Sequence, residues 1–135
     1  MKVIGFNLTK ISVSKKEVAP TDFKIKSNIE IKDLIKDKID ISKQEILKLK
    51  FGFTVDYDPD LAKIELDGYI VIVPESDELK KIMKFWKDKK LPDNIRIPLF
   101  NFIMTKCNVK ALMLEDEMGL PFHVPMPKLG PKNKE

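Results

Sequence analysis

The chain has 135 residues, of which 43% are hydrophobic and 34% charged, so it can bury a core and is not a disordered segment. Its 25 Lys and Arg residues against 21 Asp and Glu give a net charge of +4, too mild and too interspersed to identify a nucleic-acid binder by charge alone. The sequence contains no signal-peptide pattern and no apolar run of 18 residues, which predicts a cytoplasmic protein without a membrane span.

The first half of the chain alternates between apolar and charged residues, as half-buried strands do. The first strand is expected from Val3 to Val13. Its apolar residues change from even to odd positions in the middle of the strand, so a bulge near residues 9–10 is needed to keep them on one face. A second strand begins at Phe23, after a connection over residues 14–22. The stretch 33–42 fits either an irregular loop or a frayed helical turn.

A long β-hairpin follows, and it has the cleanest alternation of the chain. Its first strand runs from Glu45 to Tyr57, and its second strand from Leu61 to Val73, after a turn at residues 58–60. The end of the second strand is apolar on both faces, which predicts burial on both sides there. The apolar residues of the first strand share one parity: Leu47, Leu49, Phe51, Phe53, Val55 and Tyr57.

Two helices are predicted after Pro74. The first is short, with Ser76 as its N-cap residue and one apolar stripe that ends at Trp86. The second is expected to begin at Ile97, with Pro98 in its first turn, and to stop at Gly119. Its apolar stripe is expected to contain Leu99, Phe102, Ile103, Ala111 and Leu114.

Strands followed by helices indicate an α+β fold. We expect a four-stranded antiparallel sheet with a short helix and a long C-terminal helix on one face. A single domain is predicted over residues 1–129, including a proline-punctuated extended tail after Gly119, and residues 130–135 are predicted to be a disordered tail.

The sequence offers no catalytic motif, and we expect no enzyme, cofactor or metal site. His123 is the only histidine, and the single Cys107 lies within an apolar helix pattern that is typical of a buried, inert thiol. The acidic run 115–117 is expected to be a solvated helix end. The five glycines do not cluster into a phosphate-binding loop.

The long helix and the tail contain more apolar residues than one stripe can bury. Phe100, Met104 and Met113 fall off the predicted stripe, which favours a homo-oligomer interface and, as the alternative, a surface for an apolar partner. A different class of function is indicated by a lysine-rich sheet face that would bind nucleic acid or an anionic surface. Its lysines are Lys24, Lys26, Lys32, Lys48 and Lys50.

The order of these elements resembles the SecB-type protein-export chaperones. The opening FNLTKISVSKKEVAP resembles their first strand with its parity slip, and IPLFNFIMTKCNVKALMLEDEMGLPFHVPMP resembles their main helix and closing segment. Between these two matches lie a long hairpin and a short helix, over about residues 45–89. The basic charge of this chain departs from the acidic surface with which such chaperones meet the SecA motor.

The resemblance implies dimers that pair into tetramers and ATP-independent binding of extended, non-native polypeptides along apolar grooves. It also leaves open a structural oligomer with one dedicated partner, such as an antitoxin in a toxin–antitoxin system. Export, antitoxin binding and anionic-surface binding therefore remain alternatives. By position, the client-binding residues implied by the resemblance are Phe51, Phe53, Tyr69, Val71, Leu120, Phe122 and Val124.

Overall fold

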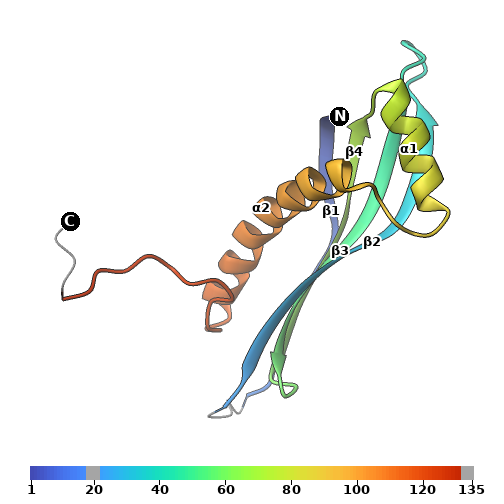
Figure 1. The fold of residues 1–135 in the computed structure, drawn as a ribbon. Helices are drawn as coiled ribbons and strands as arrows, with labels where there is room; N and C mark the ends of the chain where they lie inside the picture. The colour runs from blue at the N-terminus through green and yellow to red at the C-terminus, as the bar shows by residue number, and fades with distance from the viewer. Residues whose placement is uncertain (18–21, 132–135) are drawn as a thin grey trace.

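The computed structural model describes residues 1–17 and 22–131 and contains four strands followed by two helices (Figure 1). Residues 18–21 of the first connection and 132–135 of the predicted disordered tail lie outside the described residues. The elements are β1 (Lys2–Lys15), β2 (Lys24–Lys38), β3 (Glu45–Asp58), β4 (Ala62–Val73), α1 (Ser76–Trp86) and α2 (Asp93–Glu117).

The four strands form one antiparallel sheet in the order β1-β4-β3-β2. The β3–β4 hairpin is therefore central, and the first two strands of the chain lie at opposite edges. In the hairpin, Phe53 pairs with Leu66 and Val55 with Ile64, which places their side chains on one face. Both helices pack on this face, which we call the core face, so the predicted α+β architecture is confirmed.

Register shifts let the edge strands follow the hairpin. In β1 a shift lies between Leu8 and Lys10, where the sequence predicted a bulge, and a further shift occurs before Gly5. In β2 a shift between Ile31 and Asp33 returns Leu34 to the core face, opposite Leu49. The ambiguous stretch is therefore strand up to Lys38, where both the loop and the helical turn were wrong. Residues 40–42 form a turn, in which the Lys43 backbone N–H donates to the Ile39 carbonyl at 2.8 Å.

The short helix α1 is capped one residue earlier than predicted. Its N-cap residue is Glu75 rather than Ser76, and the carboxylate of Glu78 accepts a hydrogen bond of 2.9 Å from the Glu75 backbone N–H. The same carboxylate lies 2.9 Å from the N-terminal ammonium of Met1. Leu79 and Ile82 are buried and attach α1 to the sheet.

The long helix α2 begins at Asp93, about one turn before the predicted start, so Pro98 lies within the helix and removes one backbone hydrogen bond. It ends as predicted, because Gly119 takes the left-handed conformation at φ +63°. The predicted stripe is confirmed in part, since Phe102 and Leu114 are only half-buried. Every fourth residue is buried: Ile95, Leu99, Ile103, Cys107, Ala111 and Glu115.

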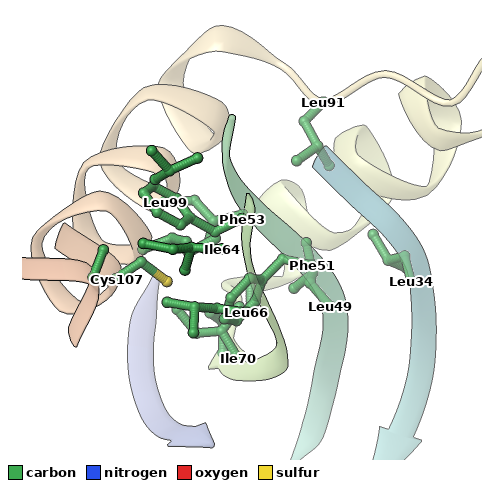
Figure 2. Close-up of a cluster of buried hydrophobic side chains, with 14 of the residues drawn as sticks. Leu34, Leu49, Phe51, Phe53, Ile64, Leu66, Ile70, Leu91, Leu99 and Cys107 are labelled. Atoms are coloured by element: carbon green, nitrogen blue, oxygen red, sulfur yellow. The ribbon is translucent and has the colours of Figure 1, made fainter. Parts of the chain in front are cut away.

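The core lies between α2 and the β3–β4 hairpin (Figure 2). Leu99 and Cys107 of α2 approach Phe53 and Ile64 of the hairpin in this view. The aromatic rings continue the core toward β1, because Phe6 stacks on Phe51 with 5.4 Å between ring centroids.

Close approach of β1 and β4 requires a glycine at position 68. A Cβ atom there would lie 2.3 Å from the backbone oxygen of Asn7 and 3.0 Å from the ring of Phe51. At Gly5, in contrast, a Cβ would meet only Val71, at the ordinary contact distance of 3.6 Å.

We predict that Gly68→Ala lowers the free energy of unfolding by about 3 kcal/mol, because backbone atoms of β1 must move to admit the methyl group. Gly5→Ala is the matched control and should change stability by less than about 0.5 kcal/mol. Urea unfolding followed by circular dichroism measures both. Equal stability of the two variants would contradict the packing described here.

Candidate functional site

A pocket of about 630 Å³ opens where β2, α1 and the start of α2 meet. Four apolar side chains form its inner wall: Ile31, Trp86, Leu91 and Phe100. Charged side chains surround them: Glu30, Lys32, Lys89, Lys90, Asp93 and Arg96. We call this site the β2–α1–α2 pocket; it combines an apolar interior with a polar rim, as many binding sites do.

Local backbone structure holds the α1 side of the pocket in place. Directly after α1, Lys89 takes a left-handed conformation with φ 58°, and its backbone N–H bonds the Trp86 carbonyl at 2.8 Å. The chain therefore reverses beside Trp86. Leu91 is 7% exposed and anchors the connection on the core before α2 begins.

Cations lie over both aromatic rings of the pocket. The Lys89 ammonium lies 5.0 Å from the centroid of the Trp86 ring, and the Arg96 guanidinium lies 6.0 Å from that of Phe100. Arg96 is also paired with Asp93 at 3.1 Å. The positive charges of Lys89 and Arg96 therefore lie at the edge of the apolar interior, where contacts with the two rings hold them.

Three of the predicted client-binding residues lie in the core. Phe51 and Phe53 are each 1% exposed and pack beneath the helices, so burial does not favour client binding by them, which stays a prediction. Leu120 is 6% exposed and is likewise closed to a ligand. The sequence pattern had correctly put Phe51 and Phe53 on one face, and that is the face that the helices cover.

The other predicted client-binding residues are more accessible but are not gathered in one place. Tyr69 and Val71 are half-buried on the opposite, open face of the sheet, and the Lys48 ammonium lies 4.1 Å from the Tyr69 ring centroid. In the tail, Phe122 is 42% exposed and Val124 is half-buried. For these four residues client binding stays a prediction.

The residues predicted to form an oligomer interface lie on α2 away from its buried line. Met104 is 39% and Met113 52% exposed, whereas Phe100 is half-buried in the lining of the pocket. Ile97 and Val109 add further exposed apolar surface on the same helix. Their role in subunit contacts stays a prediction.

The predicted lysine-rich face is the open face of the sheet, where carboxylates interrupt it. Lys32 lies 3.1 Å from Asp67, and Lys26 lies 3.8 Å from Asp58. Neighbouring charges of both signs weaken the field that a phosphate backbone would meet. Binding of nucleic acid through this face stays a prediction.

A buried polar cluster joins the end of α2 to the tail, and it corrects the prediction of a solvated helix end. Glu115 is fully buried, with its carboxylate 2.8 Å and 3.0 Å from Nδ1 of His123 and 3.2 Å from the His123 backbone N–H, which donates to it. Nε2 of His123 lies 2.8 Å from Oδ1 of Asn108. The imidazole therefore connects two side chains of α2 to the tail.

A second tie holds the tail against β3, where the Tyr57 hydroxyl donates to the Pro121 carbonyl. Burial, together with the nearby Glu115 carboxylate, raises the pKa of Tyr57, so this hydroxyl keeps its proton. The sequence held a signal for the cluster, because Glu115 continues the line of every fourth residue from Leu99. The predicted stripe contains Ala111 and Leu114 but not Glu115, because glutamate side chains are almost always exposed.

Cys107 and His123 do not form a catalytic pair. Burial raises the pKa of the fully buried Cys107 thiol to about 12, which leaves it protonated and unreactive near neutral pH. Within residues 1–17 and 22–131, no three His, Cys, Asp or Glu side chains gather as metal ligands. None of the helices in that part of the chain is long and apolar enough to cross a bilayer.

The chain has a SecB-like fold. It resembles the solved structure of a SecB-like chaperone from Mycobacterium tuberculosis, Rv1957, in complex with a ChAD peptide from the Rv1956 HigA1 antitoxin. The TM-score is 0.59 and the sequence identity 10%, and the match covers 96% of this chain and 90% of the other. No protein-family model and no curated protein sequence matches this chain.

We predict that Glu115→Ala lowers the free energy of unfolding by about 3 kcal/mol, because it leaves a buried imidazole without its carboxylate partner. Faster hydrogen exchange of the amides from Leu120 to Val124 should accompany the loss. Glu117→Ala removes an exposed carboxylate from the same helix end and serves as the control. If both variants expose the tail equally, Glu115 does not anchor it.

Proposed function

We propose that this chain binds extended segments of other polypeptides without ATP and without catalysis, as a SecB-like holding protein. The observation that carries the proposal is the β2–α1–α2 pocket, an apolar interior beside an exposed edge strand. The SecB-like fold supports it, because a protein of that fold was solved in complex with a peptide. We propose no catalytic role for Cys107, because its buried thiol stays protonated.

The binding energy would come from burial of apolar client side chains. An apolar side chain that enters between Trp86 and Phe100 leaves water, at about 25 cal/mol per Å² of apolar area. The neighbouring β2 edge presents backbone groups that pair with nothing in this sheet, and an extended client can use them. Such binding is passive and reversible, so client release follows from its equilibrium.

Two further apolar surfaces extend the proposal. Tyr69 and Val71 on the open face, and Phe122 and Val124 in the tail, are sites where a long client would make weaker, secondary contacts. In Figure 1 the red end of the described chain leads away from the sheet, so it adds surface beyond the domain. The antitoxin peptide of the structural neighbour supports one dedicated partner as an alternative to many unfolded clients.

We also propose that α2 forms the contact of a homodimer or homotetramer. Met104 and Met113 leave much of their side chains in water in the single chain. Association through the exposed surface of α2 would remove that area from water, while the buried line of the helix stays on the sheet.

The holding function predicts that equimolar protein suppresses aggregation of a chemically denatured client, measured by light scattering. Trp86→Ala, which removes the largest apolar side chain of the pocket, should weaken suppression several-fold. Ile41→Ala removes an apolar side chain that is 98% exposed and does not line the pocket, so this variant should suppress aggregation as well as the parent protein. No suppression by the parent protein at a several-fold excess would refute the function.

The oligomer proposal predicts that the double variant Met104→Glu, Met113→Glu falls to the monomer mass in light scattering coupled to size exclusion. Two carboxylates would be desolvated in the interface, a cost of several kcal/mol. Ile41→Glu introduces the same kind of charge away from α2 and should leave the assembly intact. A parent protein that is itself a monomer at micromolar concentration would exclude the interface.

A further inference from the structure

We propose that the β2–α1–α2 pocket selects segments in which an apolar side chain is flanked by carboxylates, and discriminates against segments flanked by lysine or arginine. The inference rests on the proposed function and specifies the chemistry of its ligand. It is derived from the charges at the rim of the pocket and from their positions relative to the two aromatic rings.

Four cations and two carboxylates line the pocket, and two of the cations are already paired, Arg96 with Asp93 and Lys32 with Asp67 of the open face. Lys32 comes from β2, Lys89 and Lys90 from the connection after α1, and Arg96 from α2. Within the described part of the chain, Lys89 and Lys90 lie within ion-pair distance of no carboxylate. Their charges are therefore available to an incoming anion.

The aromatic rings strengthen the preference. Lys89 already lies over the Trp86 ring and Arg96 over the Phe100 ring, at 5.0 Å and 6.0 Å from the centroids. A basic ligand residue would have to displace these cations or approach them against like charge. A carboxylate would instead pair with them while they keep their places over the rings.

The two carboxylates that line the pocket do not cancel its preference for an acidic ligand. Asp93 is already paired with Arg96 at 3.1 Å, which leaves Glu30 as the second acidic group at the rim. The chain's own C-terminal segment is a poor occupant by charge, because it carries Lys128, Lys132 and Lys134 against one glutamate. An acidic segment of another protein fits best.

Trp86 gives a direct readout because it is the only tryptophan of the chain. The probes are three tryptophan-free peptides with the same central Leu-Phe-Leu anchor, flanked on each side by two glutamates, two serines or two lysines. Titration of Trp86 fluorescence should show the glutamate peptide binding about three- to tenfold more tightly than the lysine peptide, as expected for a few partly exposed ion pairs. The difference should shrink at high salt.

Charge reversal tests the location. The double variant Lys89→Glu, Lys90→Glu should reverse the order of the glutamate and lysine peptides, and Lys90→Glu alone should reduce the difference without altering the left-handed residue. Lys80→Glu, Lys81→Glu makes the same change in net charge on α1 outside the pocket lining and should keep the original order. Circular dichroism verifies that each variant is folded.

The possible outcomes distinguish a failure of charge selection from a failure of polypeptide binding. Equal affinities for the three peptides would overturn charge selection while leaving polypeptide binding in place. A reversed order in the Lys80, Lys81 control would also overturn it, because net charge and not the pocket would then decide. Absence of binding by every peptide would remove the proposed function itself.

Discussion

The packing of one line of α2 side chains against the β3–β4 hairpin is the interaction on which the rest of the structure depends. Ile95, Leu99 and Ile103 are at most 1% exposed, and each buried aliphatic side chain contributes about 1.5–3 kcal/mol. This contact fixes the position of α2 along the sheet. As a consequence the first turns of the helix reach the pocket beside α1, and its last turn reaches the tail.

The same line of residues ends in a carboxylate, and this fixes the tail. The Glu115 carboxylate is buried, and the backbone N–H and Nδ1 of His123 are its hydrogen-bond partners. These hydrogen bonds offset the cost of taking the carboxylate out of water. A polar cluster of this kind has one arrangement that satisfies all its members, whereas apolar contacts allow many. The tail therefore leaves α2 at a defined point, although its described residues, 120–131, contain no helix or strand.

The two sides of the molecule have different chemistry. The core face is closed by the helices, and its openings occur at the margins, where β2 meets the connection between α1 and α2. The open face mixes lysines with carboxylates such as Asp67 and Asp58, so it carries little concentrated charge. The pocket differs because apolar side chains such as Trp86 and Phe100 line it beside the charges, and this combination is the basis of the proposed polypeptide ligand.

The sequence alone determined the strands apart from the end of β2, the bulge before Lys10 and the stop at Gly119, because local alternation and backbone preference act within a few residues. The three-dimensional packing decided the rest. Alternation grouped Phe51 and Phe53 correctly, but only the placement of α2 showed that their face is covered. Likewise Glu115 looks solvated from its acidic neighbours and is buried because His123, eight residues later, returns to meet it. A sequence pattern states which side chains share a face, and only the tertiary structure determines what lies against that face.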